Sequence, residues 1–255
     1  MRIDDEAVLW SASPSDRAER PLLVLLHGFN SHEGDLFGLA PYLPLAPAIA
    51  SLRAPIDAGY GYAWFPLLAQ GEEQALESAD QATTAIIDWL DRVAPDTTSV
   101  GLLGFSQGGV YSLSIAAQTG GAAAVVAYYP VTDFEEWLEE SGGLLGRRWV
   151  FRLIRHHFFR QSDAKSDEEF SELLARASPL RHAEQIRCPV LLIHGDRDKS
   201  AGVEQSRRLA ARLRELGTPV ELLEIPGAGH VFNFRDREKA ELAWQATLRW
   251  LGRYL

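Results

Sequence analysis

The chain has 255 residues, 46% of them hydrophobic and 24% charged, which is ordinary for a globular protein and excludes a disordered or collagen-like chain. Its single cysteine, Cys188, excludes an internal disulfide and a multi-cysteine zinc or iron–sulfur site. The formal charge of −10 argues against nucleic acid or an anionic membrane surface as a partner.

Short apolar runs alternate along the chain with longer segments of helical periodicity. The predicted strands are residues 22–26, 48–52, 100–105, 122–129, 189–193 and 220–225. The predicted helices are residues 72–93, 110–118, 204–216 and 238–255. This alternation is typical of βαβ units, and a sheet covered on both faces explains why the strands are continuously apolar. The sequence therefore predicts an α/β fold with a mostly parallel sheet, whose ligands bind at the carboxyl ends of the strands.

The segment 131–180 interrupts this alternation, because it is too long for a simple crossover between two strands. Its first part is acidic, whereas residues 147–160 combine arginines with an aromatic face at helical spacing. We predict a single domain over 1–255, in which 131–180 forms a helical lid across the strand ends. The alternative is one or two ordinary packed helices. A helix on a membrane surface is disfavoured by the adjacent acidic run.

A candidate nucleophile, Ser106, stands in a G-x-S-x-G pattern between Gly104 and Gly108. The pattern alone is weak, but an apolar run precedes it and a helical pattern follows, as in a nucleophile elbow. The sharp turn requires the two glycines, because side chains there would collide with neighbouring backbone. It also places Ser106 at a helix N-terminus, where partial positive charge favours a developing anion. The alternative is an ordinary glycine turn with a capping serine.

An alcohol needs a base to act as a nucleophile near neutral pH, and the chain has seven histidines. We predict that His230 is the base, because it lies in a loop of small residues after the last predicted strand. His27 and His194 precede glycines at strand ends, so we expect them to hold loop geometry. The acid that orients the base is predicted to be Asp198, with Asp196 as the less favoured alternative.

The transition state of acyl transfer carries an oxyanion, which needs preorganised N–H donors. We predict that the backbone N–H groups of Gln107 and Phe29 supply them. Gln107 follows the candidate nucleophile, and Phe29 follows a glycine in the loop after the first predicted strand. The residues predicted to line the substrate pocket are Trp64, Phe65, Trp137 and Trp149.

The order Ser106, Asp198, His230 along the chain is that of α/β-hydrolases, and the chain resembles serine esterases of that fold over nearly its whole length. The first half resembles the phospholipase and carboxylesterase group that includes acyl-protein thioesterases, in residues 26–28, 53–55, 63–65 and 104–109. The second half resembles dienelactone hydrolases and the catalytic domain of prolyl oligopeptidases, in residues 178–180, 188–195 and 227–230. A mosaic joined near 125–132 is one hypothesis for this difference.

The chain also departs from these relatives. Dienelactone hydrolases use a cysteine nucleophile, whereas the elbow here carries Ser106. Prolyl oligopeptidases have a propeller domain, for which 255 residues leave no room. After the acid, such relatives usually carry an apolar turn with a proline, whereas residues 199–203 contain no proline, which predicts a looser loop around Asp198.

These features predict a carboxylesterase that uses no cofactor and no metal and acts on small-molecule esters with short-to-medium acyl or aryl groups. The first alternative is a thioesterase or lysophospholipase that acts on acyl-protein or lipid. An alternative of another class is a hydrolase-like ligand-binding protein without turnover, and a peptidase is less favoured. No apolar run approaches the roughly 20 residues of a membrane span, and the acidic N-terminus lacks a signal-like stretch, so we expect a cytoplasmic protein. The sequence does not indicate an oligomeric state.

Overall fold

The structure is a computed structural model that describes residues 1–17, 20–44, 46–65, 73–94, 99–140 and 167–255. In these residues, a seven-stranded sheet has the strand order β1-β3-β2-β6-β7-β8-β9. Its strands are β1 (Leu9–Trp10), β2 (Leu22–Leu26), β3 (Ala48–Leu52), β6 (Val100–Phe105), β7 (Ala122–Tyr128), β8 (Val190–Gly195) and β9 (Val220–Ile225). All neighbours pair in parallel except β1 and β3, which confirms the predicted α/β class.

Two short features of the sheet were not predicted. Strand β1 pairs antiparallel at the edge, and the separate hairpin strands β4 (Ile56–Asp57) and β5 (Tyr62–Ala63) form a two-stranded sheet. Each of these strands has two residues, too few for an apolar pattern to become visible in the sequence.

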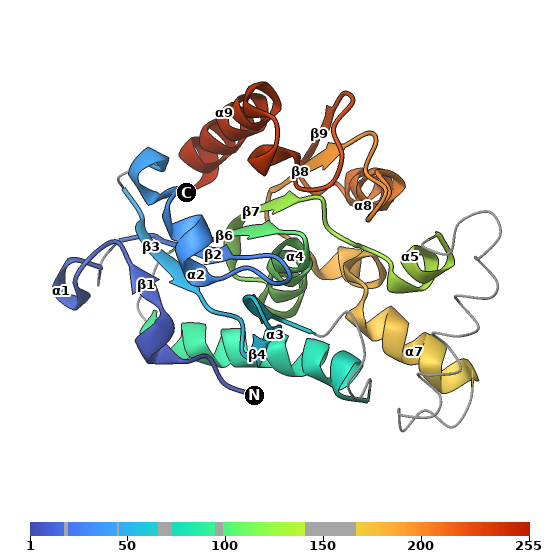
Figure 1. The fold of residues 1–255 in the computed structure, drawn as a ribbon, viewed down its shortest axis with the longest axis horizontal. Coiled ribbons are helices and arrows are strands. Elements are labelled where there is room, and N and C mark those ends of the chain that lie inside the picture. The colour runs from blue at the N-terminus through green and yellow to red at the C-terminus, as the bar shows by residue number, and fades with distance from the viewer. Residues whose placement is uncertain (18–19, 45, 66–72, 95–98, 141–166) are drawn as a thin grey trace.

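Helices cover both faces of the large sheet, with α9 on one side and α3 and α4 on the other (Figure 1). The helices are α1 (Pro14–Arg17), α2 (Glu33–Phe37), α3 (Glu73–Val93), α4 (Gln107–Thr119), α5 (Phe134–Glu140), α7 (Asp167–Ala177), α8 (Glu204–Glu215) and α9 (Arg237–Tyr254). Short 3-10 helices occupy Asp5–Ala7, Ala40–Tyr42, Pro179–Gln185 and Phe232–Phe234. Among the described residues, none of the helices is both long and apolar enough to cross a bilayer.

The alternation of side chains along each strand divides the core into two layers. In β2, Leu22, Val24 and Leu26 belong to the cluster that includes residues of α3, α4 and α8. Leu23 and Leu25 belong to the opposite cluster, which includes residues of α2 and α9. Both faces of β2 are therefore buried, which explains its unbroken apolar run.

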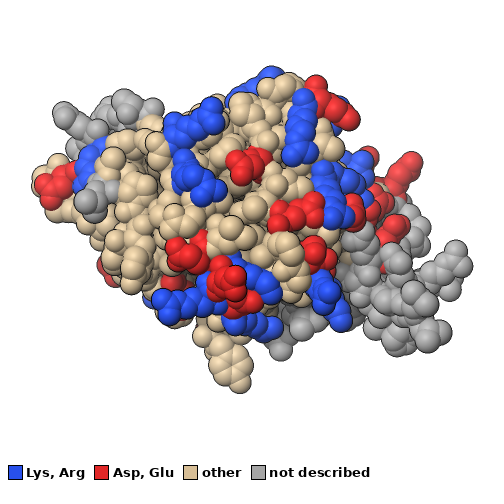
Figure 2. All heavy atoms as spheres, turned by 90° about the horizontal axis from the view of Figure 1, so that it is seen from above, with Lys and Arg blue, Asp and Glu red and all other residues tan. Residues whose placement is uncertain are grey.

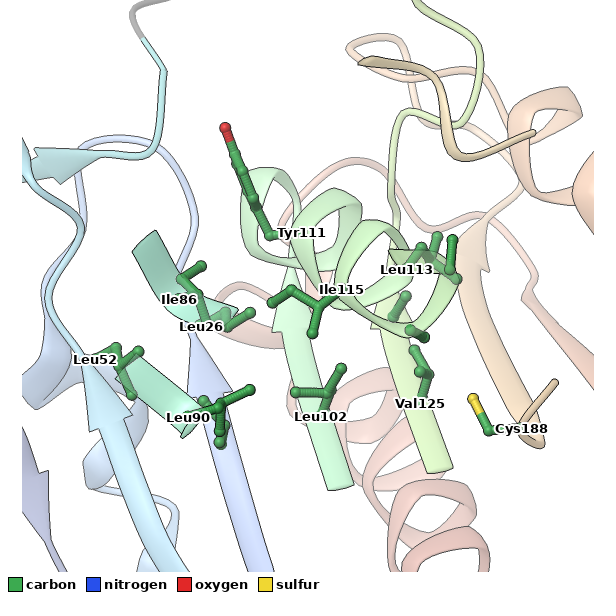
Figure 3. Packing of buried hydrophobic residues seen from close by; sticks show 14 of the residues in the cluster. Leu26, Leu52, Ile86, Leu90, Leu102, Tyr111, Leu113, Ile115, Val125 and Cys188 are labelled. Carbon is green, nitrogen blue, oxygen red and sulfur yellow. The ribbon is translucent and has the colours of Figure 1, made fainter. Parts of the chain in front are cut away.

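Cys188 lies in the layer on the α4 side, near Val125 (Figure 3). The thiol is buried, and this burial raises its pKa to about 11. A thiol with so high a pKa carries little thiolate at neutral pH, so Cys188 is poorly suited to act as a nucleophile.

Acidic and basic side chains are interspersed over the face of the molecule seen in Figure 2. This face therefore carries no large continuous area of one charge. Ion pairs join such groups elsewhere in the described residues too, as where the Arg207 guanidinium bonds to Glu224 at 2.9 Å and also pairs with Glu204.

Candidate active site

The turn between β6 and α4 holds Ser106 in a strained backbone conformation, with φ 53° and ψ −115°. A Cβ at Gly104 would overlap the carbonyl of Gly108, and a Cβ at Gly108 would overlap the carbonyl of Leu26. The turn therefore requires glycine at both positions. The Ser106 N–H donates to the carbonyl of Tyr128 at 2.9 Å, which ties the turn to the end of β7.

The structure brings Ser106, His230 and Asp198 into one chain of hydrogen bonds at the carboxyl ends of the strands. Ser106 Oγ lies 3.1 Å from Nε2 of His230, and Nδ1 of His230 lies 2.6 Å from Oδ2 of Asp198. The carboxylate only accepts, so Nδ1 carries a proton and Nε2 of the neutral ring can accept the hydroxyl proton of Ser106. The three side chains follow β6, β8 and β9.

The carboxylate of Asp198 is buried and well supplied with donors. Its Oδ1 accepts from the N–H groups of Ser200 at 2.8 Å and Ala201 at 3.0 Å. Burial by itself would raise the pKa of Asp198, but hydrogen bonds from His194, His230 and the backbone outweigh it and hold the pKa well below its ordinary value. Asp198 is therefore ionised at neutral pH.

The alternative acid, Asp196, does not bond to His230. Its Oδ1 accepts from the N–H of Gly227 at 2.6 Å, which joins the loop after β8 to the loop after β9. His27 also holds a loop, because its Nδ1–H donates to the carbonyl of Gly28 at 2.7 Å and its Nε2 accepts from the N–H of Ala54 at 3.0 Å.

The two proposed oxyanion donors belong to the elbow and to the loop after β2. Gln107 is the first residue of α4, so its N–H has no carbonyl within the helix to bond. Phe29 follows Gly28, where a Cβ would lie 3.4 Å from Cβ of Ser106, so this backbone runs beside the elbow. We retain both N–H groups as proposed donors.

The side chain of Gln107 has a role that was not predicted from the sequence. Its Oε1 accepts from the N–H of Trp64 at 3.1 Å, and its Nε2 donates to the carbonyl of Phe65 at 2.8 Å. These bonds fasten the segment after β5 to the elbow. A residue pair 43 positions apart carries no local sequence signal for such a contact.

A cavity of about 80 Å³ opens beside Ser106 and His230. Its lining is mainly apolar and comprises Phe65, Ser106, Gln107, Val110, Val131, Phe134, Trp137, Ser200, Ala201 and His230. Of the predicted pocket residues, Phe65 and Trp137 thus line the cavity. Trp149 lies outside the described residues.

Trp64 does not line this cavity, contrary to expectation. Its side chain is fully buried in the core, where Nε1–H donates to the carbonyl of His27 at 2.8 Å and the ring lies beside Tyr111. The core satisfies both the apolar surface and the single donor of the indole, while the next residue, Phe65, faces the cavity.

The structure describes two helices of the expected lid, α5 and α7, whereas residues 141–166 lie outside the described ranges. Phe134, Leu138 and Leu174 of these helices form a small apolar cluster with Val110 of α4. Trp137 Nε1–H donates to the carbonyl of Ser200 at 2.7 Å, so α5 is also joined to the loop that carries Asp198.

A larger cavity of about 350 Å³ lies between α2 and α9, and neither Ser106 nor His230 lines it. Its walls include Leu36, Phe105, Asn233 and Trp244. Within the described ranges, no cluster of three His, Cys, Asp or Glu side chains is arranged to hold a metal ion.

Comparison with models of known protein families identifies the family of this chain. The model of the dienelactone hydrolase family matches residues 57–255, a range that contains Ser106, Asp198 and His230. The chain belongs to the dienelactone hydrolase family. The match begins in the first half and runs through residues 125–132, where the two resemblances meet.

Similar proteins include both peptidases and esterases. The uncharacterized peptidase YtmA of Bacillus subtilis is 32% identical over 54% of this chain and 50% of its own length. The human acylamino-acid-releasing enzyme is 25% identical over 99% of this chain and 34% of its own length. The chain thus spans half or less of these curated relatives. The crystal structure of esterase PE8 covers 100% of both chains with a TM-score of 0.64 at 23% identity, which confirms the α/β-hydrolase fold.

Proposed function

We propose that the protein is a serine hydrolase that cleaves carboxylic esters through an acyl-enzyme. The observation that carries this proposal is the continuous hydrogen-bond chain from Ser106 through His230 to buried Asp198, built on a strained turn. An alcohol held against a neutral imidazole, itself oriented by a carboxylate, is the arrangement that activates serine for acyl transfer.

In this mechanism Ser106 Oγ attacks the ester carbonyl carbon while His230 takes the hydroxyl proton at Nε2. Asp198 holds the ring by its Nδ1–H and stabilises the imidazolium that forms. The backbone N–H groups of Gln107 and Phe29 stabilise the oxyanion. His230 then gives its proton to the leaving alcohol, and water repeats the sequence on the acyl-enzyme, so the ester yields an acid and an alcohol.

The cavity beside Ser106 supports substrates with short-to-medium acyl or aryl groups. Its volume is about 80 Å³, and aromatic rings of Phe65, Phe134 and Trp137 contribute to its walls. These walls would bind an apolar acyl or aryl group by removing its surface from water rather than by pairing with a charge.

We also propose that 131–180 acts as a helical lid on a single domain that spans 1–255. Two contacts support this role: Phe134 and Trp137 of α5 line the cavity, and Trp137 bonds to the acid loop. Helix α7 packs against α5, because Leu174 of α7 contributes to the same apolar cluster as Phe134 and Leu138 of α5.

The experiment is a series of p-nitrophenyl esters from acetate to octanoate, run with the native chain, Ser106→Ala and a matched control, Ser114→Ala. Ser114 lies in α4, the helix that follows Ser106, and does not line the cavity beside Ser106. We expect Ser106→Ala to lose at least about 10³-fold in kcat and the control to lose nothing. A fluorophosphonate probe should form a bond from phosphorus to Ser106 Oγ with loss of HF, which adds the mass of the phosphonyl group to the peptide that contains Ser106. Turnover retained in Ser106→Ala would refute the mechanism, and tight ligand binding without turnover would favour a binding protein.

A second candidate is hydrolysis of an amide next to an amino acid, because YtmA is named a peptidase and the human relative is named for releasing acylamino acids. Matched p-nitrophenyl ester, thioester and p-nitroanilide substrates with one acyl group separate the candidates. A kcat/KM for the anilide that approaches that of the ester would favour the peptidase. A preference for the thioester would favour a thioesterase.

A further inference from the structure

Asp198 faces two histidines rather than one. Its Oδ2 lies 2.6 Å from Nδ1 of His230 and 3.5 Å from Nε2 of His194. His194 is in β8 and is fully buried, and it takes no part in the proposed acyl transfer. A buried polar ring at this distance from the candidate acid requires an explanation.

The hydrogen bonds of His194 define where its proton lies. Its Nε2 is 2.8 Å from the carbonyl oxygen of Ala201, and its Nδ1 is 2.7 Å from Oγ of Ser206. A carbonyl only accepts, so Nε2 carries a proton and donates it to Ala201, while Nδ1 is hydrogen-bonded to the Ser206 hydroxyl. The Ala201 carbonyl thereby selects the tautomer that points N–H toward Ala201 and Asp198, and Ser206, at the beginning of α8, holds the other side of the ring.

The same imidazole closes the loop around the carboxylate. Ala201 donates its N–H to Oδ1 of Asp198 and receives the Nε2–H of His194 at its carbonyl. Residues 199–203 of this loop contain no proline, and a looser loop was predicted for that reason. Bonds from His194 and Trp137 to successive carbonyls hold it instead.

We propose that His194 is a positioning residue for Asp198. Its Nε2–H fixes the Ala201 carbonyl and faces Oδ2, which keeps the carboxylate in its 2.6 Å contact with His230. This inference rests on the proposed function, because it assigns a consequence for turnover. Ser206 supports His194 from its other side through the hydrogen bond to Nδ1.

Two conservative substitutions of His194 distinguish a role in positioning Asp198 from a role that only fills the core. In His194→Gln, the side-chain amide nitrogen can reach the place of Nε2 and donate to Ala201. In His194→Asn, the shorter amide reaches only the place of Nδ1, beside Ser206. Both variants bury one amide at a similar site, so a purely structural role predicts similar kinetics for them.

We expect His194→Asn to lower kcat about 10- to 100-fold with KM nearly unchanged, because a small misplacement of an orienting group costs that much. His194→Gln should restore kcat to within about threefold of the native value, a difference of less than 1 kcal/mol. Thr247→Val is the control, since it removes a buried hydrogen bond to Tyr128 on the other face of the sheet. It should lower stability and leave kcat unchanged.

A second readout does not depend on turnover. The Nδ1–H of His230 in its short bond to Asp198 should give a strongly deshielded proton resonance, identified by its loss in His230→Gln. The native chain and His194→Gln should retain this resonance, and His194→Asn should lose it or shift it upfield. Equal kcat and an unchanged resonance in His194→Asn would overturn the proposal.

Further outcomes keep the two proposals distinct. A native chain with no ester turnover defeats the proposed function, while the resonance still tests the positioning role. If His194→Asn does not fold, Ser206→Ala takes its place, because it removes the hydrogen bond that holds Nδ1 of His194 and so loosens the ring. We then expect kcat to fall severalfold at constant KM, and an unchanged kcat and resonance would overturn the proposal.

Discussion

Tyr129 packs its ring against the imidazole of His230, with ring centroids 4.6 Å apart, and its hydroxyl donates to Oδ1 of Asn233 at 2.6 Å. Tyr129 follows β7, whereas Asn233 lies in the 3-10 helix after His230. Burial raises the pKa of Tyr129 well above its usual value, so the hydroxyl stays a donor at neutral pH. This bond ties the loop of the candidate base to the end of β7.

Tyr129→Phe should keep the ring contact and lose this tie. We expect the free energy of unfolding to fall by about 1 kcal/mol, the usual net value of one hydrogen bond, and kcat to fall severalfold. Urea unfolding and ester kinetics measure the two effects. Tyr129→Leu, which also removes the ring, should lower both the free energy of unfolding and kcat further. Equal kcat in all three proteins would show that the contact does not position His230.

The ionised carboxylate of Asp198 should make the free energy of unfolding fall as the pH becomes acidic. Because its folded pKa lies below that of an unfolded carboxyl, about 3.9, the ionised group stabilises the fold fully above that pH. Below it the unfolded chain binds the proton first, and the stabilisation is lost as pH falls toward the folded pKa. The unfolding free energies of native and Asp198→Asn proteins should therefore differ by a constant amount above about pH 5 and converge below about pH 4. A gap that persists unchanged to pH 3 would contradict this account.

The elbow glycines and a helical glycine should respond oppositely to the same substitution. Gly108→Ala places a methyl group in the carbonyl of Leu26, so we expect a loss of about 3 kcal/mol or more, or failure to fold. Gly252→Ala, in α9, meets open space and should add about 0.5 kcal/mol through helix propensity. Thermal and urea unfolding compare them. A fully stable Gly108→Ala would mean that the elbow is not as tight as described.

Neighbouring aromatic residues should separate substrate preference from stability. Phe65→Ala enlarges the cavity, so the ratio of kcat/KM for octanoate over acetate should rise about tenfold. Trp64→Phe should leave that ratio unchanged and lower stability by about 1–3 kcal/mol, because the buried carbonyl of His27 loses its donor. The ester series and urea unfolding give both numbers. The reverse pattern would place Trp64 in the pocket after all.

Much of the fold could be predicted because its signals are local. The strands at 22–26, 48–52 and 100–105 coincide with predicted runs, since a strand buried on both faces is continuously apolar. The strand at 220–225 also coincides with its prediction, although it is only partly buried and contains two glutamates. The helix predicted over 72–93 was also correct to within one residue. The two-residue strand β1 was missed, because its pairing with β3 depends on a partner about 40 residues away.

For the candidate site, the sequence by itself determined the identity of the chemical groups. Gly104 and Gly108 flank Ser106 because a Cβ at either position would overlap nearby backbone, and their spacing indicates the elbow once the preceding apolar run and the following helical pattern are included. Asp198 and His230 were identifiable because the carboxyl ends of parallel strands meet at one edge of a sheet.

Only the tertiary structure decided how these groups are supported. It turned Trp64 into the core and Phe65 into the cavity, joined Gln107 to the segment after β5, and placed His194 behind Asp198. Trp64 and Phe65 lie in a bend after β5, and a single sequence does not show which of two adjacent side chains there faces a cavity. Hydrogen bonds between distant segments depend on the packing of whole elements, so no local pattern reports them.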